Sequence, residues 1–144
     1  MIEKVNYKND MLALIVRGKY RVKKGVTFFT PKESIQQFGY MRHKKSHIIK
    51  PHLHKKRKTR IMYTSEVILL LKGLLRVDFY NKNKKYLFSK ILKPKDIIML
   101  VKGGHGFKVL KEVQMIEIKQ GPYSLSKDKI KFENIDENKI KIKK

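Results

Sequence analysis

His52 and His54 are the residues of this chain whose types and spacing most suggest chemistry. In an extended segment alternate side chains leave on the same face, so these two rings point together with Cα atoms roughly 7 Å apart. Neutral imidazole nitrogens bind divalent metals at about 2.0–2.1 Å, and two of them at this spacing can meet on one ion. The commoner outcome for such a pair is two polar residues on a solvated face, so the pair alone does not establish a site.

Two further candidates follow downstream. Glu66 begins an apolar run, where it is either a metal ligand or a buried acid paired with a basic residue such as Arg60 or Arg76, because an unpaired buried carboxylate is very costly. His105 lies between glycines and is either a ligand or a turn residue. The chain has no cysteine, so any metal must be held by nitrogen and oxygen atoms.

The order of these residues resembles the two motifs of the cupin superfamily. The first motif contains His-x-His, a glutamate and a glycine seven residues after it, as in His52, His54, Glu66 and Gly73. The second has a turn with Pro and Asp, a strand and a further histidine, as in the segment from Pro94 to His105. The resemblance covers about residues 25 to 120 and is to small single-domain bacterial cupins. Eleven residues separate His54 from Glu66, more than in cupins, so we expect residues 55–60 to loop out.

This resemblance implies a fold and a metal centre. The fold would be all-β, a double-stranded β-helix, which is the jelly-roll barrel of cupins. The ligands carried over from the family are His52, His54, Glu66 and His105. The ion would be a divalent first-row metal, namely Fe, Mn, Ni or Zn.

The sequence around these residues predicts mainly short strands separated by turns. This pattern is typical of an antiparallel sandwich or barrel. We expect a long strand over residues 61–71 that turns at Gly73 into a hairpin partner over 74–80. Further strands are expected at 86–92, 97–101, 105–110 and 113–119, with turns at 81–84 and 93–96. A capping box with proline at the first helical position predicts one short helix near residues 31–37.

Length and composition suit one domain. The 144 residues divide into an N-terminal strand region over 1–24, a cupin barrel over 25–125 and a lysine-rich tail over 126–144, which we expect to be partly ordered. No apolar run is long enough to span a membrane, and a cytoplasmic protein is expected. The net charge of +24 comes mostly from lysines spread along the whole chain. Such a diffuse surplus favours a solvated surface over nucleic-acid binding.

Three functions remain open. The leading one is a metal-binding cupin that takes a small polar or anionic molecule, with Arg57, Arg60 and Tyr63 as substrate-binding residues. The second is a metal-free sugar-nucleotide isomerase or epimerase of polysaccharide biosynthesis, in which His52 or His54 is the base and Tyr63 the acid. The third is a basic nucleic-acid-binding protein. A homodimer is compatible with each of them.

Overall fold

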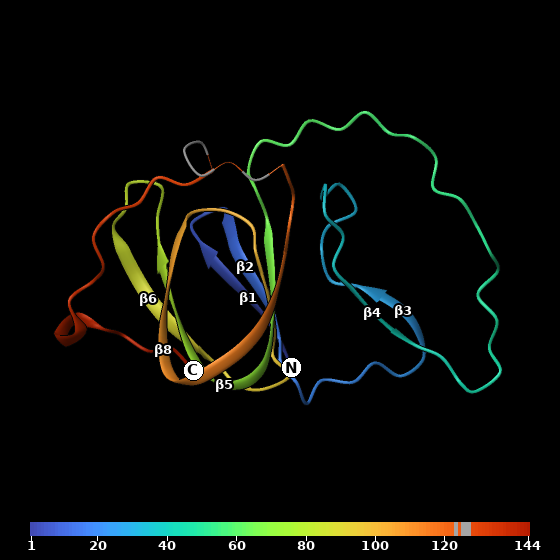
Figure 1. Ribbon diagram of the computed structural model, residues 1–144, viewed down its shortest axis with the longest axis horizontal. Helices are drawn as coiled ribbons and strands as arrows, with labels where there is room; N and C mark the ends of the chain where they lie inside the picture. The colour runs from blue at the N-terminus through green and yellow to red at the C-terminus, as the bar shows by residue number, and fades with distance from the viewer. Residues whose placement is uncertain (123, 125–127) are drawn as a thin grey trace. The chain divides into compact units, whose positions relative to one another are not determined.

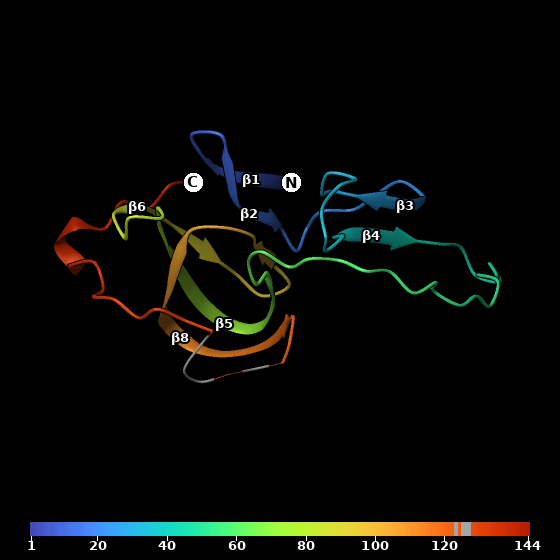
Figure 2. The ribbon, with the colours of Figure 1, turned by 90° about the horizontal axis from the view of Figure 1, so that it is seen from above.

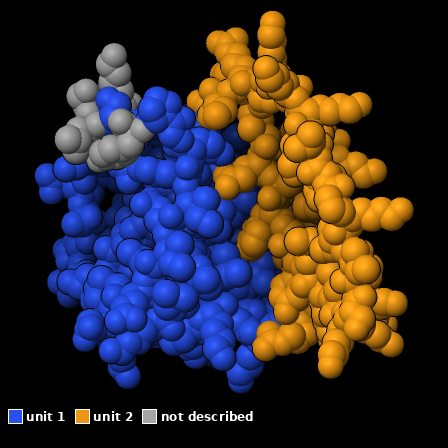
Figure 3. Space-filling view, turned by 45° about the vertical axis from the view of Figure 1, so that its right-hand side comes forward, with its two compact units in different colours: residues 1–20, 63–144 blue, residues 21–62 orange. Residues whose placement is uncertain are grey.

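The computed structural model describes residues 1–122, 124 and 128–144 of the chain. Residues 123 and 125–127, at the predicted boundary between barrel and tail, lie outside the described residues. Two compact units are present, coloured separately in Figure 3. The first combines Met1–Tyr20 with Tyr63–Lys144, and the second is Arg21–Met62. The predicted three-segment organisation stays a prediction.

The first unit is built on one antiparallel sheet of six strands (Figure 1). These are Ile2–Tyr7 (β1), Asp10–Val16 (β2), Glu66–Tyr80 (β5), Tyr86–Leu92 (β6), Ile97–Leu100 (β7) and Gly104–Lys119 (β8). The strand order is β1-β2-β7-β5-β6, and β8 pairs with the other edge of β5. Within the described residues there is no α-helix, only a 3-10 turn at Glu137–Lys139 (η1). The predicted all-β class is confirmed.

The two long strands β5 and β8 curl together (Figure 2). We predicted a hairpin turn at Gly73, and that prediction is wrong, because β5 continues through this residue as one strand. Gly73 has a φ of +91°, and the register with β8 shifts on both sides of it. An irregularity of this kind bends a strand without reversing it. A Cβ atom at Gly73 would collide with the backbone carbonyl of Glu112, so only glycine fits.

The core lies on the inner face of the curled sheet. Leu75, Val77 and Phe79 alternate along β5 and are buried on this face, because side chains two residues apart on a strand point to the same side. They pack with apolar residues elsewhere on β5 and on the other strands, namely Val5, Leu12, Ala13, Ile15, Ile68, Leu70, Phe88, Leu92, Ile98 and Leu100. Each fully buried Val, Leu, Ile or Phe stabilises the fold by roughly 1.5–3 kcal/mol relative to exposure. This burial fixes which face of β5 points inward.

The second unit contains one hairpin. Its strands are Gly25–Phe28 (β3) and Gly39–Arg42 (β4), and residues 43–62 after it form neither strand nor helix. Within the described part of the chain, no helix has the length and apolar character needed to cross a membrane.

The helix predicted near residues 31–37 is absent from this unit, so that prediction is wrong. A single turn forms, in which the Ser34 amide donates to the Pro31 carbonyl at 3.0 Å. The side-chain amide of Gln37 then donates to the carbonyls of Pro31, Lys32 and Ser34 at 2.9–3.1 Å. Carbonyls that a helix would pair with later backbone amides are therefore satisfied by one side chain, and the helix does not propagate.

Candidate functional site

Glu66 and His105 meet on the inner side of the curled sheet. The Nε2 atom of His105 lies 3.0 Å from Oε2 of Glu66, and Glu66 is only 5% exposed. In the β5–β8 register His105 sits opposite Phe79, thirteen residues along β5 from Glu66. A straight strand would separate these positions by roughly 40 Å. The curl of the sheet, together with the short turn from β7 to β8, is what brings the two side chains into contact.

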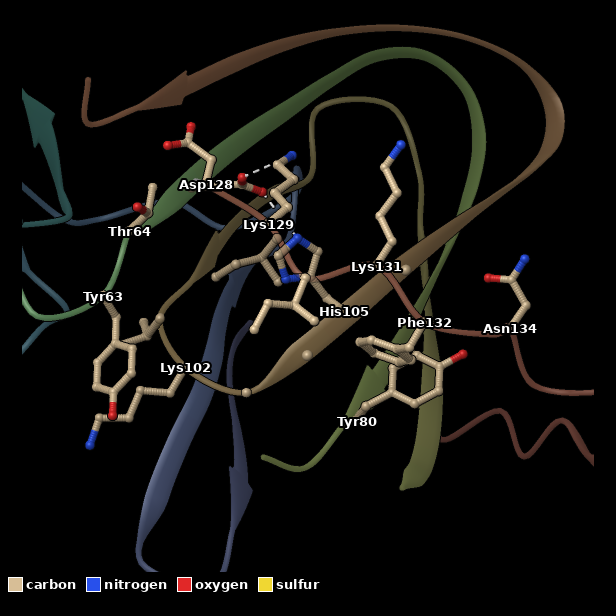
Figure 4. Close-up of a pocket in the computed structure, with 17 residues that line it drawn as sticks. Tyr63, Thr64, Tyr80, Lys102, His105, Asp128, Lys129, Lys131, Phe132 and Asn134 are labelled. Carbon is tan, nitrogen blue, oxygen red and sulfur yellow. Dashed lines mark hydrogen bonds and ion pairs between the residues drawn. The ribbon is translucent and has the colours of Figure 1, made fainter. Parts of the chain in front are cut away.

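The pair lies in a cavity of about 450 Å³ within the first unit (Figure 4). One side is made by the start of β5, the end of β7 and the glycine-rich start of β8, and the other by the C-terminal segment. The lining residues are Tyr63, Thr64, Glu66, Tyr80, Leu100, Val101, Lys102, Gly103, Gly104, His105, Gly106, Asp128, Lys129, Ile130, Lys131, Phe132 and Asn134. The cavity is large enough for a small molecule.

Glu66 is held ionised by its surroundings. The hydrogen bond from His105 is the largest influence on its pKa, burial opposes it, and the charges of His105 and Lys129 add to it. Together they lower the pKa of Glu66 from 4.5 to about 2. An ionised carboxylate can only accept, so Nε2 of His105 carries the shared hydrogen. Glu66 is paired with His105 and Lys129, and its role as a metal ligand stays a prediction.

Arg76 is not the partner of Glu66. It belongs to the outer face of β5, where its guanidinium donates to Asp78 at 2.8 and 3.1 Å and to Glu137 at 2.7 and 2.9 Å. This separation follows from the alternation of side chains along the strand, which places Arg76 and Asp78 opposite to Leu75 and Val77.

The atoms of the Glu66–His105 pair have the separation that two adjacent ligands of one ion need. Ligands bound at about 2.1 Å and at right angles to one another are about 3 Å apart, and the observed distance is 3.0 Å. Imidazole nitrogen and carboxylate oxygen also form a donor set that suits first-row divalent metals. Glu66 and His105 therefore fit two positions of such a site. Within the described residues, no group of three or more histidine or acidic side chains is arranged to hold an ion.

His52 and His54 belong to the second unit and are exposed. Their ring centroids are 5.2 Å apart with an interplanar angle of 77°, so the two rings are neighbours. The Nδ1 atom of His52 is 2.9 Å from the carbonyl oxygen of Lys50. The predicted four-ligand site takes two residues from each unit, and it stays a prediction.

The predicted substrate-binding residues fall into two groups. Tyr63 lines the cavity, whereas Arg57 and Arg60 are exposed residues of the second unit. Sequence analysis missed the contribution of the C-terminal segment, above all Lys129 and Phe132. The one signal for it is that Phe132 is the only aromatic residue after position 123.

No family model matches this chain, and no curated protein or solved structure matches it. The cupin resemblance therefore rests on the motif residues alone and stays a prediction.

Proposed function

We propose that this protein binds a divalent first-row metal and a small anionic molecule at the cavity of the first unit, in the manner of a cupin. The observation that carries this proposal is the contact between the buried Glu66 carboxylate and His105 inside a cavity of about 450 Å³. A buried acid and a histidine facing a cavity, with one strongly lowered pKa, are typical of functional sites.

The double-stranded β-helix is the finer fold assignment within this proposal. In its support, β5 and β8 are long strands that pair over nearly their whole length and curl together (Figure 2). The ordered motif residues His52, His54, Glu66 and His105 are the second support.

Glu66 and His105 would hold the metal, and the motif order gives His52 and His54 as the other candidate ligands. For both atoms to bind a cation, Nε2 of His105 would first have to lose the hydrogen that it donates to the carboxylate. A metal bound there would supply Lewis-acid chemistry to an oxygen ligand. The chain itself contributes an ionised carboxylate that is ready to bind a cation at neutral pH, because the pKa of Glu66 is about 2.

Lysines around the cavity favour an anion as the small molecule. Lys102 pairs with Asp10 at 2.9 Å and Lys129 with Glu66 at 3.4 Å. Within the described residues, Lys131 has no acidic partner and is available to a ligand. Fixed positive charges of this kind attract carboxylate or phosphate groups.

A metal-free isomerase or epimerase is the second candidate, and the Glu66–His105 pair favours it too. A carboxylate that accepts from one ring nitrogen orients the imidazole and makes the other nitrogen a better base. His105 would take a proton from a bound sugar, and Tyr63, which lines the same cavity, would return one.

Metal content separates these candidates. We expect the purified protein to contain close to one equivalent of Fe, Mn, Ni or Zn by elemental analysis, and its thermal midpoint to fall on chelation. Glu66→Gln and His105→Ala should each lose most of the metal. A variant with both His52 and His54 changed to alanine tests whether these two residues are ligands.

The matched control is the other histidine pair of the second unit, His43 and His47, whose rings stack at 4.2 Å. Their replacement by alanine should leave the metal content unchanged. Metal-free protein that also fails to bind added ions with a dissociation constant below about 100 μM would contradict the metal proposal and leave the isomerase.

A further inference from the structure

The C-terminal segment forms one wall of the cavity although it has no regular structure there. Six of its residues line the cavity, namely Asp128, Lys129, Ile130, Lys131, Phe132 and Asn134. No helix or strand covers residues 128–134, so backbone pairing does not fix their positions. Something else must hold this wall in place if the cavity is to have a defined shape.

Lys129 links this wall to the chemical centre. Its Nζ atom lies 3.4 Å from Oε1 of Glu66, on the carboxylate oxygen that His105 does not contact. The Lys129 side chain is still about half exposed, so solvent reaches it beside Glu66 (Figure 4). It can therefore contact both Glu66 and the anionic group of a bound molecule.

Phe132 and Ile135 dock the middle of the segment. The Phe132 ring packs edge-to-face on Tyr80 with centroids 5.0 Å apart. A Cβ atom at Gly104 would come within 2.9 Å of the Phe132 ring, so the glycine makes room for it. The backbone amide of Ile135 donates to the hydroxyl of Tyr80 at 3.2 Å. These contacts hold the segment against the start of β8.

Glu137 provides a second attachment. Its carboxylate accepts two hydrogen bonds from Arg76, at 2.7 and 2.9 Å. Arg76 is 5% exposed and is itself fixed by two hydrogen bonds to Asp78. A bidentate pair with a guanidinium that is already held in one orientation is specific in direction as well as favourable. Glu137 is therefore attached to a rigid part of β5.

The end of the chain is attached separately. Ser89 of β6 donates its backbone amide to the Lys141 carbonyl at 2.8 Å and accepts from the Lys143 amide at 2.9 Å. Loss of Glu137 would therefore leave residues 141–143 in place and loosen mainly the stretch before them, which would still contact Tyr80 through Phe132 and Ile135. That stretch includes Lys129 and Phe132.

We propose that Glu137 is a positioning residue for the cavity: its ion pair with Arg76 holds the C-terminal segment so that Lys129 binds the anionic group of the ligand. The proposal rests on the anion binding put forward as the function of the cavity. It adds that the C-terminal segment is part of the ligand-binding site, and that the contact of Glu137 with the outer face of the sheet influences the affinity.

Inorganic phosphate is the probe, titrated against the full chain by NMR at low ionic strength. We expect Glu137→Gln to weaken phosphate binding about fivefold or more, and Glu137→Asp to have a smaller effect. The matched control is Glu133→Gln, an exposed acid on the same segment, which should leave the affinity unchanged within twofold. It makes the same change in net charge, so it removes the general electrostatic effect from the comparison.

A double-mutant cycle with Lys129→Met distinguishes positioning from a general loss of stability. If Glu137 acts through Lys129, Glu137→Gln should add little further loss in the Lys129→Met background. Hydrogen exchange of residues 128–136 should also be faster in Glu137→Gln, while residues 141–143 keep their protection. The NMR amide signals of the sheet residues show whether each variant is folded. If Glu137→Gln does not fold, the double-mutant cycle is carried out with Glu137→Asp, which is the milder change.

The outcomes separate the two proposals. If the unaltered protein does not bind phosphate, anion binding in the cavity is wrong, and the role of Glu137 falls with it. If the unaltered protein binds and Glu137→Gln binds equally well, only the role of Glu137 is wrong. If Glu137→Gln weakens phosphate binding by the same factor in the unaltered chain and in Lys129→Met, the positioning role of Glu137 is also wrong.

Discussion

Replacing Glu66 with glutamine should destabilise the protein at neutral pH and have no effect in strong acid. The pKa of Glu66 falls from 4.5 to about 2 on folding, and one pKa unit corresponds to about 1.4 kcal/mol, so the ionised carboxylate contributes about 3 kcal/mol. Part of this comes from Lys129, whose side chain is 52% exposed. Solvent screens that part, so we expect a loss of about 2–3 kcal/mol.

The pH dependence follows from the sign of the pKa change. Because the pKa of Glu66 is lower in the folded state, its contribution is fully present above about pH 4.5 and is lost as the pH falls towards 2. Other carboxylates also titrate in this range, but they do so in both proteins. The difference in unfolding free energy between the unaltered chain and Glu66→Gln therefore isolates this one group.

Urea unfolding in the presence of a chelator, at several values between pH 7 and pH 2.5, measures that difference. Glu133→Gln is the control and should stay within about 0.5 kcal/mol of the unaltered protein at pH 7, since its side chain is exposed. A difference for Glu66→Gln that remains constant down to pH 2.5 would refute the electrostatic origin. No difference at pH 7 would refute the pairing with His105 and Lys129.

Three further outcomes are expected. Leu75→Ala should lower the unfolding free energy by about 2–5 kcal/mol in urea because Leu75 is fully buried, while Leu53→Ala, at a residue 96% exposed, should change it by less than about 0.5 kcal/mol. Gly73→Ala should cost more than about 1 kcal/mol by the same assay, since its φ is +91° and its Cβ would meet the Glu112 carbonyl; an unchanged midpoint would mean that the bend relaxes. In a gel-shift titration at physiological ionic strength, we expect the unaltered chain to bind nucleic acid with a dissociation constant no lower than about 10⁻⁶ M. A lower dissociation constant would support the nucleic-acid-binding function instead.

Local pattern was enough to predict the all-β class and several of its elements. Residues 86–92 were predicted as a strand and form β6 with the same bounds. The preceding turn was also predicted, and in it the Asn81 side chain accepts from the amides of Asn83 and Lys85. Both signals depend on neighbouring residues alone, namely alternation along a strand and the ability of asparagine to replace a backbone acceptor.

The geometry at Gly73 was decided by tertiary structure. A glycine after a lysine in an apolar run is compatible with a hairpin turn and with a bend in a continuous strand. Here β8 pairs with β5 on both sides of Gly73, so the chain bends and continues. That choice depends on a partner strand more than thirty residues later, which the local sequence does not reveal.

The candidate site depends on the same long-range packing. The motif order pointed to Glu66 and His105, but their contact requires the curl that begins at Gly73. Lys129 was not predicted at all, because its position depends on the ion pair between Glu137 and Arg76, residues 61 positions apart in the chain. The sequence alone determined which histidines, acids and lysines are available as ligands, bases or charged groups. Which of them meet was decided by sheet curvature and by the attachment of a segment that has no periodic pattern of its own.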